Sequence, residues 1–474
     1  MLFCSLPFCL FFLIVFVTYW ILPWRAGRVY LLLAASFYFY AAWNQWLALL
    51  LTASALLDYF LARGMEDWSA PRVRKLLLLL SLAGNLGLLC YFKYANFFLR
   101  SLEECAASAG FQMLLPTLRV ILPVGISFYT FEAINYTVDV YRRKMHAERN
   151  LAHFLLFILF FPHLMAGPIV RARDFLPQVH RRKRFSWLRA HTGILLIILG
   201  VIKKMGVADR IALYVDPVFA DPGAFNSIAL WSAAVGYALQ VYCDFSGYSD
   251  MALGLAHLLG YHLARNFKLP FLSANLAEFW QRWHTSLSTW IRDYLFIPLG
   301  GSHGSRGQTA RNVLLTMALC GLWHGANWNC VLWGFLTGVL LVIHSYFARW
   351  CRQRPRLDAA LRTRTGTAGR VALTFAVFCL TMGIFRSQGL ANAGVMLAGM
   401  LAPVRGADLT LPAFGLYLTF ALVALAHALG WRDRWLTLWR SLPSMARGLA
   451  LGSAVTAVVV LAPSASKAFI YFQF

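Results

Sequence analysis

Acidic residues are scarce in this sequence. Its 19 Asp and Glu residues are outnumbered by 43 Lys and Arg residues, and charged residues of both signs make up only 13% of the 474 positions. An ordinary soluble domain is about 25% charged and about 45–50% apolar. This chain is 60% hydrophobic. The shortage of charge excludes an ordinary soluble protein and predicts an all-α, multi-pass membrane protein.

Motifs for metals and disulfides are also lacking. The nine cysteines are scattered, without a CxxC pair and without the Cys/His spacing of a zinc site. The sequence therefore predicts no metal site, no disulfide framework and no permanently bound cofactor. No polar linker and no repeat of fixed period divides the chain, so we predict a single membrane domain over residues 1–474. The missing repeat argues against an inverted-repeat transporter.

Basic residues occur mainly in short loops between apolar runs, and the net charge is +24. Such loops set the orientation of the chain in the membrane and contact anionic lipid headgroups. Nucleic acid is not an expected partner. The positive-inside rule places these loops in the cytoplasm and both termini on the other, periplasmic side. The first apolar run has no basic leader, so we expect it to be a retained helix. The cytoplasmic loops are predicted at 63–75, 142–149, 171–189, 265–311, 349–370 and 431–446.

The stretch GLWHGANW, residues 321–328, places His324 beside Trp323 in a strongly apolar region. An ionisable side chain at membrane depth is costly and usually marks a functional site. Gly321 and Gly325 allow a backbone or a substrate to approach closely. Asn327 is suited to orient an imidazole or to bind a carbonyl oxygen. The alternative is a structural histidine that donates to a backbone carbonyl.

A second histidine lies in AEFWQRWHTSLSTWIRDYLFIPLGG, residues 277–301. The pattern predicts an amphipathic helix along the membrane surface, with His284 and Ser288 on one face. Taken alone, His284 fits an interface histidine as well as a catalytic residue. The run 151–170 contains Pro162 and Gly167 and predicts a re-entrant segment.

Further polar residues occur in apolar surroundings. Glu132, Asn135 and Asp139 are spaced to line one helix face, and Asp244 precedes FSGYS. Each is open to interpretation as a satisfied contact between helices. Together they indicate a polar path through the protein.

These stretches resemble the membrane-bound O-acyltransferase family, in particular its bacterial alginate O-acetyltransferase type. The core motif region is 118–347. The matching segments are YFKYANFF at 91–98, LPVGISFYTFEAINYTVDVYR at 122–142, FFPHLMAGPIVRARDF at 160–175, DFSGYSDMALGL at 244–255, EFWQRWHTSLSTWIRDYLFIPLGG at 278–301 and LCGLWHGANWNCVLWG at 319–334.

The resemblance implies a ring of tilted and re-entrant helices around a central tunnel, in a bacterial inner membrane. It also implies that His324 is the family's invariant histidine and His284 its second conserved one. The donor would be a cytoplasmic acyl-CoA such as acetyl-CoA. The acceptor would be a glycan such as alginate, cellulose, peptidoglycan or another exopolysaccharide, and a separate extracytoplasmic transferase of the SGNH type would complete the transfer.

We hypothesise that His324 is the general base that takes a proton from an acceptor hydroxyl. Asn327, or a donor from the segment 283–288, would stabilise the oxyanion. Arg282, Arg292 and Lys268 are candidates for contact with CoA phosphates, although arginines facing lipid headgroups fit equally well.

The aromatic tail within residues 464–474 ends in FIYFQF, where Tyr471 is a candidate transient acyl carrier and an interfacial anchor is the alternative. Two rival functions stay open. One is a transporter or flippase for a lipid-linked glycan, and the other is direct acylation of a lipid or small molecule.

Overall fold

The computed structural model describes residues 3–165, 167–430, 434–461 and 469–470. Within these residues the regular structure is helical, and the one pairing of extended residues is an isolated bridge between Phe225 and Ala407. The predicted all-α class is confirmed. Two compact units are present: unit 1 comprises residues 1–197 and 249–264, and unit 2 comprises residues 198–248 and 265–474. The single domain over 1–474 stays a prediction.

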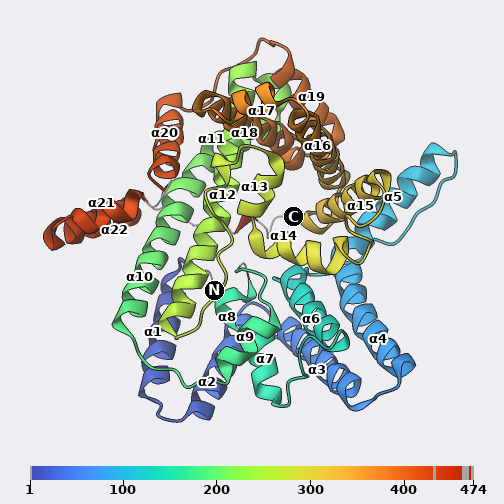
Figure 1. The fold of residues 1–474 in the computed structure, drawn as a ribbon, viewed down its shortest axis with the longest axis vertical. Helices are drawn as coiled ribbons and strands as arrows, with labels where there is room; N and C mark the ends of the chain where they lie inside the picture. Colours follow the sequence, from blue (N-terminus) through green and yellow to red (C-terminus); the bar gives the residue numbers. More distant parts are fainter. Residues whose placement is uncertain (1–2, 166, 431–433, 462–468, 471–474) are drawn as a thin grey trace. The chain divides into compact units, whose positions relative to one another are not determined.

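Unit 1 is formed by the N-terminal helices and the end of α12 (Figure 1). Its helices are α1 (Leu6–Ile21), α2 (Arg25–Ala41), α3 (Gln45–Asp67), α4 (Pro71–Leu89), the π-helical η1 (Cys90–Tyr94), α5 (Ala95–Ser108), α6 (Ile126–Tyr141), α7 (Leu151–Leu159), α8 (Phe161–Leu164), α9 (Ala172–Val179), most of α10 (Trp187–Val201) and the last turns of α12 (Ser227–Leu258).

Buried polar side chains join three of these helices. The Asp58 carboxylate on α3 accepts hydrogen bonds from the Ser81 hydroxyl at 2.6 Å and from the Asn85 amide at 2.8 Å, both on α4. The Ser81 hydroxyl oxygen also lies 3.1 Å from the Thr137 hydroxyl oxygen on α6. In an apolar surrounding such contacts fix which helix faces meet, because each polar group must find a partner.

The predicted re-entrant segment 151–170 is a broken helix. Helix α7 ends at Leu159, and α8 begins at Phe161 with Pro162 in its first turn, where the missing proline N–H costs nothing. After α8 the chain approaches itself closely: a Cβ on Gly167 would lie 2.5 Å from the His163 Cα. Both breaks occur where the sequence places Pro162 and Gly167.

Unit 2 contains the remaining helices. They are the π-helical η2 (Ile202–Ala208), α11 (Asp209–Ala220), the 3₁₀ turn η3 (Pro222–Ala224), the first part of α12, the 3₁₀ turn η4 (Pro270–Leu272), α13 (Leu276–Arg282), α14 (Thr285–Ile291), the π-helical η5 (Arg292–Phe296), α15 (Arg306–His324), α16 (Trp328–Arg352), α17 (Pro355–Arg362), α18 (Arg364–Arg386), α19 (Gly389–Leu401), α20 (Ala413–Gly430), α21 (Arg434–Ser441) and α22 (Ser444–Leu461).

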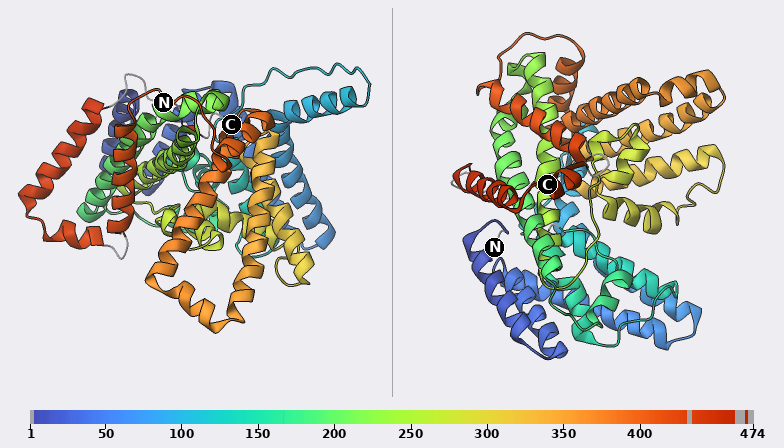
Figure 2. Two further views of the ribbon diagram at one scale, coloured as in Figure 1. Left: turned by 90° about the horizontal axis from the view of Figure 1, so that it is seen from above. Right: turned by 60° about the vertical axis from the view of Figure 1, so that its left-hand side comes forward.

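Three long elements of unit 2 support the site described below. Helix α15 packs along α16, and α16 packs along α18, with the short α17 joining the far ends of α16 and α18 (Figure 2). Glycines line the seam between α15 and α16. A Cβ on Gly321 would lie 2.1 Å from the Cys330 carbonyl oxygen, and one on Gly334 would lie 2.2 Å from the Met317 carbonyl oxygen. The two helices therefore approach at backbone distance, which only glycine permits.

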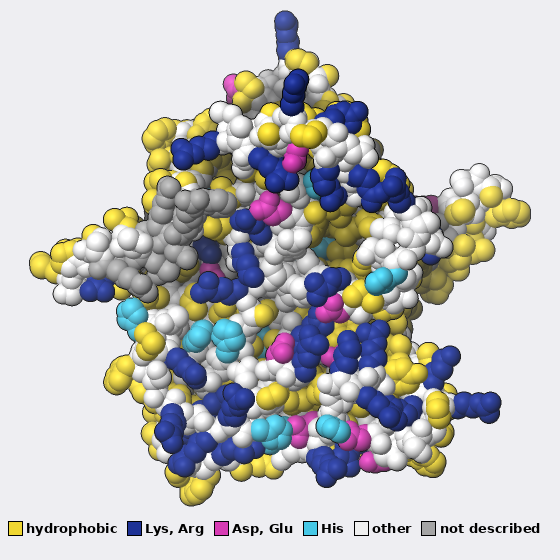
Figure 3. Space-filling view, in the orientation of Figure 1, with side chains coloured by type: hydrophobic (Ala, Val, Ile, Leu, Met, Phe, Trp, Pro, Cys, Tyr) yellow, Lys and Arg dark blue, Asp and Glu magenta, His cyan; other side chains and the backbone are white. Residues whose placement is uncertain are grey.

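Among the described residues, five helices are long and apolar enough to cross a membrane: Gln45–Asp67, Pro71–Ser108, Trp328–Arg352, Arg364–Arg386 and Ala413–Gly430. Shorter apolar helices lie at Leu6–Ile21, Leu151–Leu164 and Gly389–Leu401. Lys and Arg side chains are spread over the face shown in Figure 3, where Asp and Glu are fewer.

Candidate active site

His324 is the last residue of α15, at the turn that leads into α16. Gly325 caps the C-terminus of α15, and the Asn327 side chain caps the N-terminus of α16 by accepting from the Cys330 N–H at 2.8 Å. A Cβ on Gly325 would lie 2.7 Å from the Cys330 sulfur, so the turn requires a residue without a side chain. The sequence predicted the close approach at Gly321 and Gly325.

Three aromatic rings surround the His324 imidazole, which is 4% exposed. Their centroids lie 4.9 Å (Trp323), 5.3 Å (Trp333) and 5.8 Å (Phe385) from the imidazole centroid, all in edge-to-face arrangements. Within the described part of the chain, the buried indole N–H of Trp333 has no hydrogen-bond partner. A buried donor of this kind is uncommon and calls for an explanation. The sequence analysis did not single out Trp333.

His284 lies between α13 and α14, and the prediction of one continuous surface helix over 277–301 is wrong here. The chain turns at Trp283 and His284, and His284 has φ of +43°, in the left-handed region. Asn266 holds this turn: its carbonyl accepts from the Thr285 N–H at 2.9 Å, and its side chain accepts from the Ser286 N–H. His284 is fully buried, and so the interpretation as an interface histidine is wrong too.

Both histidines contact the same tryptophan. The Trp323 ring centroid lies 6.4 Å from that of His284 and 4.9 Å from that of His324. The other side of His284 packs edge-on against Phe245 at 4.6 Å. His284 lies outside the candidate spans; burial, and then the nearby His324, lower the pKa of its imidazole well below the ordinary value. The ring is therefore neutral near pH 7 and can accept or donate a hydrogen bond.

Asp244 on α12 belongs to a buried cluster of charged side chains. The Lys204 ammonium lies 2.6 Å from the Asp244 carboxylate and 2.9 Å from that of Asp209, and all three side chains are buried. The other Asp244 oxygen accepts from the Ile470 N–H at 2.8 Å. Sequence reasoning did not include Lys204 in the site, although a lysine inside an apolar run is a signal for such a pairing.

This contact fixes the start of the aromatic tail. The Phe469 ring, which is buried, lies 4.7 Å from the Tyr248 ring and 5.5 Å from the Phe245 ring, which itself contacts His284. Tyr471, the candidate acyl carrier, lies outside the described residues. Phe469, two residues before Tyr471, is thus two ring contacts away from His284.

The supporting residues have diverse positions. The Ser288 hydroxyl donates to the Trp283 carbonyl at 3.2 Å, across the His284 turn. The Asn327 side chain is exposed and its oxygen is used as the helix cap. Glu132 lies in unit 1, where its carboxylate is 3.1 Å from His163 and accepts from the Val170 N–H at 2.9 Å. His324, His284, Trp323 and Asp244 belong to unit 2.

The three proposed donor-binding residues lie beside the His284 turn in the chain. The Lys268 N–H donates to the Arg282 carbonyl at 2.9 Å, and the Arg282 guanidinium pairs with Glu278 at 2.6 Å. Arg292 is exposed and lies 2.8 Å from Asp293. A separate pocket of unit 2 opens between the start of α13 and the ends of α16, α17 and α18. Its lining includes Arg352, Arg362 and Arg370.

Comparison with known proteins identifies the type of reaction that the chain catalyses. The chain is 40% identical over 409 residues to the probable alginate O-acetylase of Azotobacter vinelandii, an alignment that covers 85% of this chain and 78% of that protein. It is 33% identical over 400 residues to the peptidoglycan O-acetyltransferase of Helicobacter pylori (78% and 73% covered) and 28% identical over 288 residues to the teichoic acid D-alanyltransferase of Bacillus subtilis (58% and 71% covered).

The sequence profile of the membrane-bound O-acyltransferase family matches residues 74–382, which include both His284 and His324. The resemblance found from the motifs is confirmed. The chain is a multi-pass membrane protein and an O-acyltransferase, and it belongs to the membrane-bound O-acyltransferase family.

Proposed function

We propose that this protein moves an acetyl group from cytoplasmic acetyl-CoA across the bacterial inner membrane for O-acetylation of a cell-envelope or exopolysaccharide glycan. The observation that carries the proposal is the buried pair His284 and His324, which contact one tryptophan from two separate helical hairpins. The Azotobacter and Helicobacter relatives are both named for O-acetylation of a polysaccharide, which supports a glycan acceptor.

His324 is the general base in this proposal. Its neutral imidazole takes the proton of an acceptor hydroxyl while the hydroxyl oxygen attacks the thioester carbonyl carbon. The carbon–sulfur bond then breaks, and the leaving CoA thiolate receives the proton back from the imidazolium. His284, neutral because it is buried, orients the donor or the hydroxyl through a hydrogen bond.

The Trp333 indole N–H is the proposed oxyanion donor. The tetrahedral intermediate places a negative charge on the former carbonyl oxygen, and a fixed donor in a water-poor site stabilises that charge strongly. Trp333 contacts His324 and its buried N–H is without another hydrogen-bond partner in the described residues, whereas Asn327 is exposed and so lies in a less water-poor position. Trp333 therefore replaces Asn327 as the first candidate.

Two positively charged regions of unit 2 are candidates for the CoA phosphates. One is the group Lys268, Arg282 and Arg292, and the other is the pocket lined by Arg352, Arg362 and Arg370. The pocket collects three guanidinium groups within one concave surface, which favours a ligand with several phosphate oxygens. The first group has carboxylate partners for both arginines, and in the pocket Arg362 likewise pairs with Asp358 at 2.9 Å, so it is the concave shape that favours the pocket.

An extracytoplasmic SGNH-type transferase completes the reaction in our proposal, and Tyr471 carries the acetyl group towards it. The Asp244–Ile470 contact supports this role, because it holds the chain just before Tyr471 where the Phe469 ring packs against Phe245, a neighbour of His284. Tyr471→Phe removes only the hydroxyl. Glycan acetylation in cells should be lost in this variant while protein levels are maintained, and retained acetylation would refute the carrier role.

The direct test uses purified protein and acetyl-CoA labelled in the acetyl group, which passes to the Tyr471 hydroxyl and, with no glycan or partner present, on to water. We expect release of CoA by the wild type, and a rate about 10²–10⁴-fold lower in His324→Gln, because a general base typically contributes that factor. His303→Gln, in an exposed loop of the same unit, is the matched control and should keep the wild-type rate. A His324→Gln variant that folds and releases CoA normally would refute the proposal. Transport of a lipid-linked glycan by the purified protein, without CoA release, would also refute it.

A further inference from the structure

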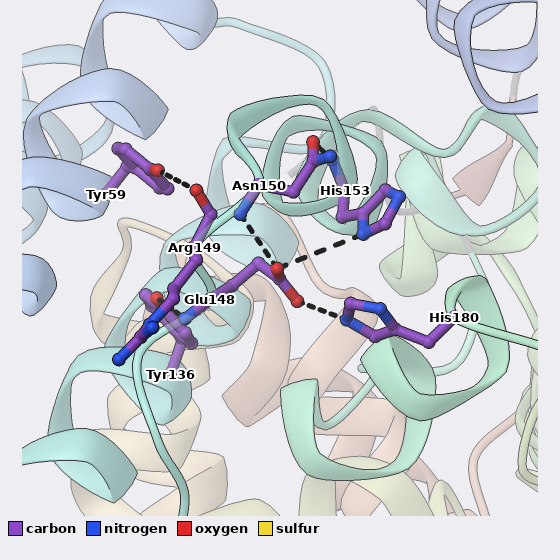
Figure 4. A network of polar contacts seen from close by, with 7 residues as sticks. All are labelled: Tyr59, Tyr136, Glu148, Arg149, Asn150, His153 and His180. Carbon is purple, nitrogen blue, oxygen red and sulfur yellow. Dashed lines mark hydrogen bonds and ion pairs between the residues drawn. The ribbon is translucent and has the colours of Figure 1, made fainter. Parts of the chain in front are cut away.

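A second cluster of ionisable side chains lies entirely in unit 1, outside the acyl-transfer machinery. Glu148, His153 and His180 each offer one ligand atom, and these three atoms lie within 4.8 Å of one another (Figure 4). The His180 Nε2 is 2.7 Å from one Glu148 oxygen, and the His153 Nδ1 is 3.9 Å from the other. The two imidazole rings face each other edge-on at 4.6 Å.

The loop between α6 and α7 holds Glu148 in place. Its N–H donates to the Tyr136 hydroxyl at 2.9 Å, and its Oε1 accepts from the Asn150 N–H at 2.9 Å (Figure 4). Asn150 also caps α7 and so fixes His153, two residues into that helix. Hydrogen bonds of this kind orient metal ligands and tune their basicity.

His153 is the observation that distinguishes this cluster from an ordinary ion pair. Its side chain is buried, and its Nδ1 points at the Glu148 carboxylate from 3.9 Å, a distance too long for a hydrogen bond. In the described part of the chain that nitrogen has no hydrogen-bond partner. A metal cation bound between the His153 Nδ1 and the Glu148 carboxylate would give that nitrogen a partner and neutralise the carboxylate charge.

We propose that Glu148, His153 and His180 bind one zinc ion. Two imidazoles and one carboxylate are a known zinc donor set, and zinc takes such ligands at about 2.0–2.2 Å in a tetrahedral arrangement. Neighbouring ligand atoms are then about 3.3 Å apart by that geometry. The three candidate ligand atoms, one from each residue, lie within 4.8 Å of one another, so side-chain shifts of about 1–1.5 Å would reach this geometry.

Three protein ligands leave one coordination position open. Glu148 and His180 also line a surface groove whose other lining residues include Lys144, Arg149 and Arg181. These cations disfavour a free metal ion in the groove but favour an anion or hydroxide as the fourth ligand. The bound ion would connect the loop before α7 to the end of α9, where His180 follows Val179.

The test measures zinc in the full-length protein, purified in detergent without a histidine tag, stripped with a chelator and dialysed against a zinc buffer. We expect about one tightly held zinc per chain in the wild type. His180→Gln should weaken zinc binding at least about tenfold. This side chain is 47% exposed, so the substitution leaves packing almost unchanged. Wild-type binding no tighter than that of His180→Gln would overturn the proposal.

His146→Gln is the matched control. His146 lies in the loop between α6 and α7 that also holds Glu148, but its side chain is 96% exposed and pairs with Glu66. It should retain zinc, and a loss equal to that of His180→Gln would also overturn the site. Cobalt substitution gives a second readout. Tetrahedral cobalt with nitrogen and oxygen ligands absorbs in the visible range without a thiolate charge-transfer band, and such a band would indicate cysteine ligands instead.

Glu148→Gln guards against misfolding, since its side-chain oxygen can still accept from the Asn150 N–H while the charge is lost. It should lose zinc and keep a cooperative unfolding transition. The proposal is independent of the acyl-transfer chemistry. His324→Gln should keep the zinc and lose CoA release, so failure of one proposal is distinguishable from failure of the other.

Discussion

At the residue scale, the imidazole of His324 has aromatic edges on three sides, and its chemistry depends on the few polar atoms that reach it. Trp333, whose ring centroid lies 5.3 Å from that of His324, carries a buried indole N–H that is the proposed donor. Trp333→Phe preserves an aromatic ring there and removes the donor. We expect CoA release to fall about 10²–10³-fold, the loss typical of one oxyanion donor, with little change in the unfolding temperature.

Trp280→Phe is the control for this prediction. Trp280 also has a buried indole N–H, and its ring packs against Trp333 at 6.0 Å. Its substitution should leave the rate of CoA release nearly unchanged. Equal losses in both variants would show that packing of the tryptophan pair, and not donation from Trp333, determines the rate.

Single residues also show what the sequence could predict. His324 was predictable because an ionisable group in an apolar run has few structural explanations. The partners of Lys204 were not, since Asp244 approaches it from a different helix. The cluster around Glu148 escaped notice for a similar reason: its ligands come from a loop, from α7 and from the end of α9, with no spacing that a zinc motif would show.

At the scale of elements, the seam between α15 and α16 positions the site, because His324 ends one helix and Trp333 lies on the other. Gly321→Ala would place a Cβ 2.1 Å from the Cys330 carbonyl oxygen, a backbone atom that cannot move alone. The helices must separate, at a cost of about 1–3 kcal/mol typical of overpacking. Thermal unfolding followed by tryptophan fluorescence should show a lower transition temperature, together with slower CoA release.

Gly369→Ala tests whether any added methyl group has this effect. Gly369 lies inside α18, and no atom lies within 4 Å of a Cβ built there. Alanine is a better helix former than glycine by up to about 1 kcal/mol, so this variant should be as stable as the wild type or slightly more stable. Destabilisation by both substitutions would contradict the importance of the seam.

Helix ends were predictable where residues of the segment itself, such as glycine, asparagine and proline, interrupt the helix. They were not predictable where contacts with distant residues set the end of a helix. The turn at GLWHGANW and the break near Pro162 follow from glycine, asparagine and proline in the sequence. The break at His284 has no such signal, because the segment alternates like an ordinary amphipathic helix. The left-handed conformation of His284 is stabilised by Asn266, which precedes it by two structural elements, η4 and α13.

At the scale of the whole molecule, the distribution of charge determines which side of the membrane meets the donor. The basic loops 171–189 and 349–370 are predicted to be cytoplasmic, and the second carries Arg352, Arg362 and Arg370 into or towards one pocket of unit 2. Acetyl-CoA is highly charged and does not cross a bilayer unaided. The proposed reaction is therefore vectorial.

Sealed membrane vesicles test this directly. Inside-out vesicles expose the cytoplasmic loops, so they should release CoA from added acetyl-CoA without further treatment. Right-side-out vesicles should release it only after detergent opens them, because the donor cannot otherwise reach the arginine-lined pocket. His324→Gln vesicles of both orientations give the background rate. Release by intact right-side-out vesicles above this background would place the donor site on the periplasmic side and contradict both the predicted topology and the direction of transfer.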